Sequence, residues 1–266
     1  MSMKRHTNNP LEKGPVPPAP RVVVVGLASC YGCQLQITNI ESHLLEVLGQ
    51  IDLRYWQLLS SMPMPDSCDV VVIEGAVTTE ESRNKVIEWR RRAKKVILVG
   101  ACANTGGVLG LAARGFQARP QEVYSEFPSA CGQAIVPRSV ADVIEVDYRV
   151  PCCPIDPFEF LEVLGKALYG SNRRLTTKTM CGDCKLNETK CFYSRGKVCL
   201  GLVTRAGCGA RCVNLGRPCN GCRGLSPEAN LDSARESVLR YGVSLPEFDA
   251  ALELFNQTNP LIIGKE

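Results

Sequence analysis

The sequence predicts an α/β protein: a doubly wound parallel sheet followed by a small, irregular, cysteine-rich domain. Two observations predict this class. Short β-branched runs alternate with helical stretches from residue 21 to about 168, and eight of the fifteen cysteines lie between residues 171 and 223. Alternating strands and helices form a sheet that helices cover on both faces. A short segment with few apolar residues buries little core and needs a covalent or metal staple.

The predicted strands are continuous apolar runs, which suit a parallel sheet that is buried on both faces. Strands are expected at 21–26, 51–59, 69–75, 94–100 and 142–148, and 51–59 has the weakest pattern. Helices are expected from Leu35 to Leu48, Glu80 to Ala93 and Pro157 to Leu168, with Thr79 as the N-cap of the second. Two more helices are expected to start at Ser226-Pro227-Glu228 and at Ser244-Leu245-Pro246-Glu247.

These patterns divide the chain into four parts. Residues 1–20 are polar and proline-rich and lack the apolar core of a signal peptide, which predicts a flexible tail on a cytoplasmic protein. The other parts are a flavodoxin-like domain at 21–170, a cysteine-rich domain at 171–225 and a helical C-terminal extension at 226–266. No apolar run approaches the ~20 residues of a membrane span, so none is expected.

Cysteine is the unusual feature of an otherwise ordinary composition. The 266 residues are 45% hydrophobic and 22% charged, but they include fifteen cysteines. An odd number of thiols without an export signal favours metal binding in a reducing compartment over disulfides. The net charge of +4 is too small to indicate nucleic-acid binding.

Three groups of cysteines each follow a predicted strand. Cys30 and Cys33 follow the first strand, Cys102 follows the fourth, and Cys152 and Cys153 follow the fifth. Because the carboxyl ends of parallel strands meet at one edge of a sheet, we expect these thiols to lie together. Four converging thiolates indicate zinc or a 4Fe–4S cluster. A thioredoxin-type redox pair would leave three of the five without a role, and zinc knuckles are usually short closed loops.

The second region contains two sets of four cysteines, spaced C-x2-C-x6-C-x7-C and C-x3-C-x6-C-x2-C. Each set is enough for one Cys₄ site, which two zinc ions or two clusters would satisfy. Residues 171–223 contain eleven Lys and Arg against two acids. Buried clusters carry net negative charge and need such cationic surroundings. An RNA-binding surface would need stacking aromatic residues, and only Phe192 and Tyr193 are present.

Five stretches together resemble the small subunit of nickel–iron hydrogenases: "SCYGCQLQI", "IEGAVTTEE", "VGACANTGG", "CCPID" and "CLGLVTRAGCGARC...CNGCRG". The pattern is most similar to the cytoplasmic sulfhydrogenase delta subunit, of the NADP(H)-linked bidirectional group. The resemblance covers about residues 21 to 225 and includes twelve cysteines in order.

This resemblance implies three 4Fe–4S clusters and their ligands. The proximal set would be Cys30, Cys33, Cys102 and Cys153; the medial set Cys208, Cys212, Cys219 and Cys222; the distal set Cys181, Cys184, Cys191 and Cys199. Periplasmic relatives have a histidine at the first distal position and a proline in place of one medial ligand. Both positions are cysteine in this chain, as in the cytoplasmic group.

Several residues stand outside these sets. The family usually has Gly-Cys-Pro-Pro at the fourth proximal ligand, whereas this chain has Cys152 directly before Cys153. Cys152 is expected either to compete with Cys153 as a ligand or to tune the site. Cys68 and Cys131 match no ligand position and are expected to be packing residues. Glu74 is a candidate for supporting the proximal site or handling a proton, and equally for a strand-end acid bound to nearby backbone. His43 is expected to be packed or solvated.

The function that the resemblance implies is electron transfer in a cytoplasmic nickel–iron hydrogenase complex. The large subunit would hold the nickel–iron centre where hydrogen reacts, so no catalytic residue is expected in this chain. A flavin- and iron–sulfur-containing partner that handles NAD(P)(H) would exchange electrons with it, and no nucleic acid or membrane span is involved. The alternatives are a hydrogenase small subunit that feeds heterodisulfide reductase or ferredoxin, and a zinc-stapled binding module. The related single-cluster subunit of respiratory complex I has adjacent cysteines in place of Cys30-x-x-Cys33 and lacks the eight-cysteine region.

Overall fold

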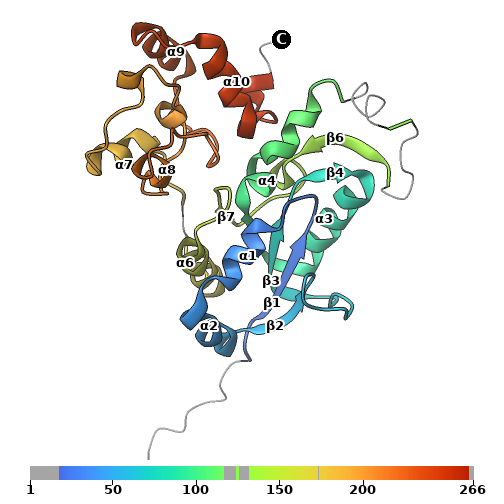
Figure 1. Cartoon of the computed structure of the whole chain (residues 1–266). Helices are drawn as coiled ribbons and strands as arrows, with labels where there is room; N and C mark the ends of the chain where they lie inside the picture. The colour runs from blue at the N-terminus through green and yellow to red at the C-terminus, as the bar shows by residue number, and fades with distance from the viewer. Residues whose placement is uncertain (1–17, 117–123, 126–131, 173, 264–266) are drawn as a thin grey trace, which may run out of the picture.

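A parallel sheet organises the larger part of the molecule in a computed structural model, which describes residues 18–116, 124–125, 132–172 and 174–263 (Figure 1). The sheet has five strands in the order β2-β1-β3-β5-β7. All four pairings are parallel. This is the strand order of a flavodoxin-like doubly wound sheet, which confirms the predicted fold class. The strands are β1 (Arg21–Gly26), β2 (Asp52–Trp56), β3 (Cys68–Glu74), β5 (Ala93–Val99) and β7 (Tyr148–Val150).

Helices cover both faces of the sheet because successive side chains of a strand point to opposite faces. Val22 and Val24 of β1 belong to a core that includes residues of α1 (Gly32–Thr38) and α6 (Pro157–Leu168). Val23 and Val25 belong to a second core, together with residues of α3 (Glu80–Arg92). Strand β1 is therefore apolar along most of its length because both of its faces are buried.

Several predicted elements are confirmed at their ends. Helix α3 begins after Thr79, whose side chain accepts a hydrogen bond from the Ser82 backbone N–H, as expected for an N-cap. Helix α6 has the predicted bounds and is capped by Asp156. Helix α10 (Leu245–Asn256) begins after Ser244, whose side chain accepts from the Glu247 N–H.

Two predicted elements near the sheet are wrong in extent. The expected helix from Leu35 to Leu48 is interrupted, because Glu41 has a φ of 46° that an α-helix cannot continue through. It is replaced by α1, a short 3₁₀ helix (Glu41–His43) and α2 (Leu44–Gln50). The strand expected at 142–148 instead begins at Tyr148. Its apolar residues Val143, Ile144 and Val146 pack against the core from a loop, so their pattern reflects burial and not strand pairing.

The sequence patterns also missed several elements and misplaced one helix start. Strands β4 (Val77–Thr79) and β6 (Ala134–Arg138) form a small antiparallel sheet, and α4 (Gly100–Thr105) follows β5. Helix α9 (Leu231–Arg240) begins after Asn230 and not at Ser226. The Ser226 hydroxyl instead donates to the Thr177 carbonyl and ties the segment to the cysteine-rich region.

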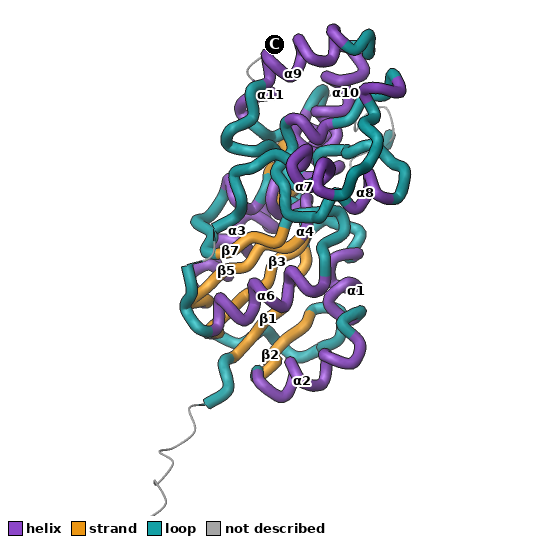
Figure 2. Tube along the Cα trace, turned by 90° about the vertical axis from the view of Figure 1, so that its left-hand side faces the viewer, coloured by secondary structure: helices purple, strands orange, loops and turns teal. Residues whose placement is uncertain are grey.

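The cysteine-rich segment consists of short elements, among them α7 (Met180–Leu186) and α8 (Arg211–Asn214), joined by loops (Figure 2). Its core is shared with the C-terminal helices, since Leu200 and Val203 belong to one cluster with Val238, Phe248 and Leu252. This unit lies beyond the carboxyl ends of the strands (Figure 1). The chain ends at α11 (Pro260–Ile263) in the described residues.

Some predictions fall outside what the structure tests. The tail lies mostly in residues 1–17 and Cys131 lies in 126–131, both outside the described residues. The division into four parts stays a prediction. Of the helices that the structure describes, none combines the length and the apolar character needed to cross a bilayer.

Candidate iron–sulfur sites

The predicted proximal cysteines all lie at the carboxyl edge of the sheet. Cys30 precedes α1, Cys33 is inside α1, Cys102 is inside α4, and Cys153 follows β7. Their charges act on one another. The pKa of Cys102 is raised to about 11, first by burial and then by the neighbouring Cys153 and Cys30 sulfurs. Burial also raises the pKa of Cys33, and Glu74, Cys153 and Cys102 raise it further. The four thiols thus form one electrostatic group.

Two glycines bring the backbone close to these sulfurs. A Cβ atom at Gly100, which has a φ of 82°, would lie 2.5 Å from the Cys33 Sγ. A Cβ atom at Gly107, with a φ of 55°, would lie 2.9 Å from the Cys102 Sγ. Because L side chains strain at positive φ and no heavy atom fits at such distances, only glycine serves at either position.

Glu74 anchors the helix that carries Cys33. Its carboxylate accepts hydrogen bonds from the backbone N–H groups of Cys33 at 3.1 Å and Gln34 at 3.3 Å. The side chain is buried at the end of β3, and burial raises its pKa. Glu74 is therefore a strand-end acid bound to nearby backbone, which was one of its two expected roles. The proton-handling role stays a prediction. His43 is half exposed on its side chain and lies edge-on to Phe158, in agreement with the solvated alternative.

The predicted medial cysteines line one cavity. Cys208, Cys212, Cys219 and Cys222 surround it together with Arg223 and Thr204. Burial raises the pKa of Cys208, and its sulfur accepts from the Ala210 and Arg211 backbone N–H groups. Burial likewise raises the pKa of Cys219 to about 12, and its sulfur accepts from the Gly221 N–H. Backbone donors aimed at cysteine sulfurs are the surroundings that tune iron–sulfur clusters.

The predicted distal cysteines form a third group. Cys181 and Cys184 lie on α7, and Cys199 is buried beside Gly201. The pKa of Cys181 is raised to about 12, first by burial and then by Cys199, Cys184 and Cys191. An ideal Cβ at Gly201 would lie 3.3 Å from the Cys181 Sγ and 3.7 Å from the Cys199 Sγ, so these two sulfurs face the same point.

Two hydrogen bonds connect the three groups in order. The Cys153 backbone N–H donates to the Cys222 sulfur, which joins the proximal group to the medial one. The Cys219 backbone N–H donates to the Cys199 Sγ at 3.3 Å, which joins the medial group to the distal one. Backbone N–H···S hydrogen bonds therefore link the three groups in order. Cys68 takes no part in them and is buried in the core at the start of β3, as expected.

Sequence reasoning missed a buried ion pair at the junction of the first two groups. Arg223 donates to Glu159 of α6 through both Nη atoms, at 2.8 Å and 3.1 Å. The Arg223 side chain is 2% exposed. The sequence does show an arginine directly after its last cysteine, but nothing in the sequence indicates that this arginine pairs with residue 159.

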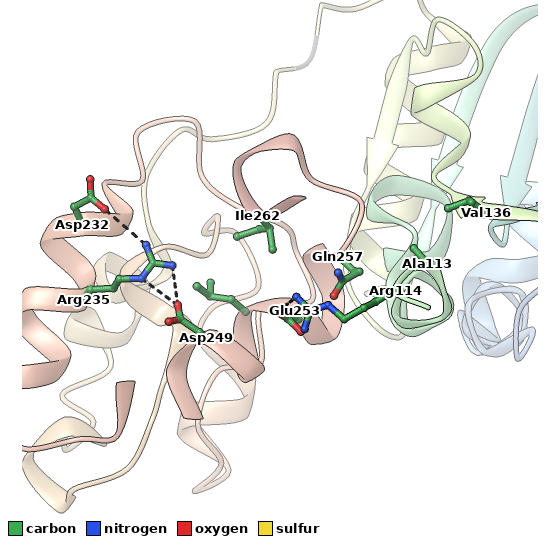
Figure 3. A pocket seen from close by; sticks show the side chains of 10 residues that line it. Ala113, Arg114, Val136, Asp232, Arg235, Asp249, Glu253, Gln257 and Ile262 are labelled. Carbon is green, nitrogen blue, oxygen red and sulfur yellow. Dashed lines mark hydrogen bonds and ion pairs between the residues drawn. The ribbon is translucent and has the colours of Figure 1, made fainter. Parts of the chain in front are cut away.

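A further cavity lies away from these groups. It measures about 630 Å³ and lies between the end of the 3₁₀ segment 107–113 and the C-terminal helices (Figure 3). Its charged side chains pair with each other: Arg235 with Asp249 and Asp232, and Arg114 with Glu253. No cysteine of the described ranges lines it. It is therefore separate from the sulfur groups.

Comparisons with known proteins agree with this arrangement. The family model described as NADH ubiquinone oxidoreductase, 20 Kd subunit, matches residues 30–167. The sulfhydrogenase 2 delta subunit of Pyrococcus furiosus is 30% identical over 87% of this chain and 96% of its own length. One subunit of the F420-non-reducing hydrogenase vhu of Methanocaldococcus jannaschii is 29% identical over 93% of this chain and 98% of its own.

Two further proteins extend the comparison. The delta subunit of the NAD-reducing hydrogenase HoxS of Cupriavidus necator is 28% identical over 56% of this chain and 79% of its own. The nickel–iron–selenium hydrogenase of Desulfomicrobium baculatum has a chain with the same fold, at a TM-score of 0.54 and 16% identity, covering 85% of this chain and 100% of that one.

The fold and the grouped thiols define an electron-transferring iron–sulfur protein built on a flavodoxin-like sheet. The chain belongs to the NADH ubiquinone oxidoreductase 20 kDa subunit family and, within it, to the small subunits of nickel–iron hydrogenases. It is thus a subunit of an oxidoreductase, and in this family the nickel–iron centre is on a partner chain. The family match ends at residue 167, whereas the hydrogenase relatives also cover the cysteine-rich segment, which the single-cluster alternative lacks.

Proposed function

We propose that this chain carries electrons through three 4Fe–4S clusters, bound by the proximal, medial and distal cysteine sets. The observation that carries the proposal is the pair of N–H···S hydrogen bonds that join the sets, from Cys153 to Cys222 and from Cys219 to Cys199. Each bond runs from the backbone of one proposed ligand to the sulfur of a ligand in the next set. Such contacts give a short path between neighbouring redox centres.

The surroundings of the sulfurs support clusters over zinc. Backbone N–H groups point at several proposed ligand sulfurs, and the segment 171–223 is strongly cationic. Both features stabilise the negative charge of a thiolate-bound cluster. When bound, the clusters would supply one-electron transfer, and the chain would hold, insulate and tune them. No group of three or more His, Cys, Asp or Glu side chains within the described ranges is arranged to hold a single metal ion.

Metal analysis tests this proposal directly. The hydrogenase complex is purified anaerobically, and iron, acid-labile sulfide and zinc are measured per copy of this chain. After subtraction of the partners' contents, about twelve iron atoms and as many sulfides are expected, because three Cys₄ sites each hold four. Two zinc ions with sulfide for a single cluster would overturn the assignment of the cysteine-rich segment. Zinc without any sulfide would overturn the electron-transfer function.

We further propose that electrons pass between a hydrogen-reacting nickel–iron centre in the large subunit and the proximal set. Cys30 and Cys153 are exposed in this chain, so the proximal sulfurs are accessible to a partner. Glu74 would keep Cys33 in place through its two backbone hydrogen bonds. Replacing Glu74 with Gln should lower the occupancy of the proximal cluster, because an amide NH₂ group cannot accept from the second N–H.

The distal end has a surface suited to an electron-exchanging partner. Leu186 and Leu215 are 83% and 76% exposed, and their neighbours Asn187 and Asn214 are hydrogen-bonded to each other. The two leucines therefore lie on one exposed surface beside the distal and medial cysteines. Six cations within residues 185–217 are also exposed: Lys185, Lys190, Arg195, Lys197, Arg211 and Arg217. This basic surface with an apolar centre fits an acidic redox partner.

We propose that this partner is a flavin- and iron–sulfur-containing subunit that handles NAD(P)(H). The resemblance to the NADP(H)-linked group and the name of the HoxS relative support it. A complex that feeds a ferredoxin or heterodisulfide reductase is the alternative. Assays of the purified complex with hydrogen and NADP, NAD or ferredoxin separate the two, and identification of the co-purifying chains gives an independent answer.

A further inference from the structure

Two arginines of the cysteine-rich segment form ion pairs with the start of α6. Arg211 pairs with Asp156, and Arg223 pairs with Glu159. Each arginine is next to a medial cysteine in the sequence, and α6 begins shortly after the proximal residue Cys153. We propose that these two pairs, the α6 clamp, set the distance between the proximal and medial clusters. The four side chains are then positioning residues for electron transfer, and this inference rests on the proposed function.

Asp156 connects the end of α6 to the medial site through two different oxygens. Its Oδ1 accepts from the backbone N–H groups of Phe158 at 2.9 Å and Glu159 at 3.0 Å, and so caps the helix. Its Oδ2 accepts from Arg211 Nη2. Because the cap holds the carboxylate against the helix backbone, the second oxygen has a fixed direction. Arg211 is thereby tied to the position of α6 itself.

The second pair is buried, and its arginine is held on several sides. Arg223 donates to the Glu159 carboxylate through both Nη atoms and to the Ala206 carbonyl through Nε at 3.0 Å. A Cβ atom at Gly207 would lie 2.8 Å from Arg223 Nη2, and Gly207 has a φ of 110°, so only glycine leaves room for the guanidinium. A planar group bound through all three nitrogens has one orientation, which fixes Arg223 relative to α6.

The two pairs act at different points of the medial set. Arg211 adjoins the cysteine pair 208 and 212, whereas Arg223 adjoins the pair 219 and 222. Asp156 and Glu159 are three residues apart, so both carboxylates lie on one face of α6. Two contacts from one helix face to two parts of the medial set restrain the tilt of the helix as well as its distance.

The clamp is coupled to the proposed ligands by short pieces of chain. Only Pro154 and Ile155 separate Cys153 from Asp156, and Ile155 is fully buried. The two arginines are directly bonded neighbours of medial cysteines. A movement of α6 away from the arginines would therefore move the proximal sulfur of Cys153 away from the medial sulfurs. The distance between the two clusters is the quantity that this movement would change.

The test is EPR spectroscopy of the whole hydrogenase complex after anaerobic reduction. Neighbouring reduced clusters split each other's signals through a magnetic interaction that weakens steeply with distance. Asp156→Asn and Arg211→Gln each remove the more exposed pair, and asparagine keeps the helix cap. Both variants should lose a similar part of the splitting between the proximal and medial signals. The double variant should lose no more than either single variant, because the two side chains act through one contact.

The buried pair should have the larger effect. Glu159→Gln removes the charge partner of Arg223 and should lose most of the splitting. Glu162→Gln is the matched control, because this carboxylate lies on the same helix and pairs with Lys166. The control should keep the splitting of the unmodified complex. Iron content is measured in every variant, so that a lost cluster is not mistaken for a displaced one.

The outcomes separate this inference from the proposed function. Unchanged splitting in the clamp variants, with full iron content, would overturn the inference even where cluster potentials shift, because the side chains would then act by charge and not by position. Additive losses in the Asp156 and Arg211 double variant would also overturn it. If Glu159→Gln loses iron, the more exposed pair and its double variant still decide. An unmodified complex without proximal and medial iron–sulfur signals would overturn the proposed function itself.

Discussion

The sheet-edge cysteines and the cysteines of the 171–225 segment are held in different ways. Cys30, Cys33, Cys102 and Cys153 are spread widely along the sequence, and strands β1, β5 and β7 bring them together. Those strands are buried on both faces between two apolar cores. The other eight cysteines lie within residues 181–222, on helices of one or two turns and on loops.

This difference shows that one fold can obtain the same kind of site by two routes. At the sheet edge, burial of the apolar strands positions the proposed ligands. The site there depends on the fold, and the fold does not depend on the site. In the cysteine-rich segment, the core is small and is shared with α9 and α10. There we expect bound metal to contribute folding energy directly, as in small metallo-domains.

The largest expected effect is that of iron removal. In chain stripped of iron and sulfide, backbone amides of residues 178–225 should lose most of their protection from hydrogen exchange. Amides of β1, β3 and β5 should stay protected, because their cores contain no metal ligand besides Cys33 among the described residues. Exchange measured by mass spectrometry with and without the clusters checks this. Equal loss of exchange protection in both regions would contradict the proposed difference between them.

A smaller effect, confined to one site, is expected from Gly100→Ala. The added Cβ would meet the Cys33 Sγ at 2.5 Å and would strain a backbone φ of 82°, so the proximal cluster should be lost. Iron should fall by about four atoms per chain, with the β-sheet still folded by circular dichroism. Gly165→Ala is the matched control. It lies inside α6 with nothing within 4 Å of the new Cβ, and it should keep all iron and stabilise slightly.

The contact between the two regions is tested by Glu159→Gln. This change leaves the buried Arg223 without its charge partner, and such losses cost about 3 to 5 kcal/mol. The cost should be measured as lower resistance of the complex to urea. Glu162→Gln on the same helix removes the charge of a half-exposed carboxylate that pairs with Lys166, and it should cost no more than about 0.5 kcal/mol. Similar costs for the two variants would mean that Arg223 and Glu159 contribute little to the junction.

The smallest effect is expected at the distal surface. Lys190→Glu should raise the KM for the electron-exchanging partner several-fold at low salt, and the difference should shrink as ionic strength rises. Arg54→Glu changes the charge by the same amount at β2, at the far end of the molecule from α7, and should have no such effect (Figure 1). Equal effects of both variants would indicate attraction by net charge and not a docking surface.

The sequence alone predicted the doubly wound sheet and the meeting of the proximal cysteines, because both depend on local patterns. Apolar runs show where buried strands are, and cysteines that follow parallel strands must reach the same edge. The same logic failed at 142–148, since an apolar loop that packs on the core has the composition of a strand. Spacing likewise sorted the other eight cysteines into two sets without any knowledge of their positions in space.

Only the tertiary structure decided how these groups touch. The Arg223–Glu159 ion pair, the Arg223–Cys152 hydrogen bond and the two N–H···S links join residues that are between 20 and 71 positions apart. No local pattern encodes such contacts, because they depend on how the cysteine-rich unit packs over the strand ends. The cysteines proposed as ligands could be identified from the sequence, whereas the hydrogen bonds around their sulfurs depend on tertiary packing.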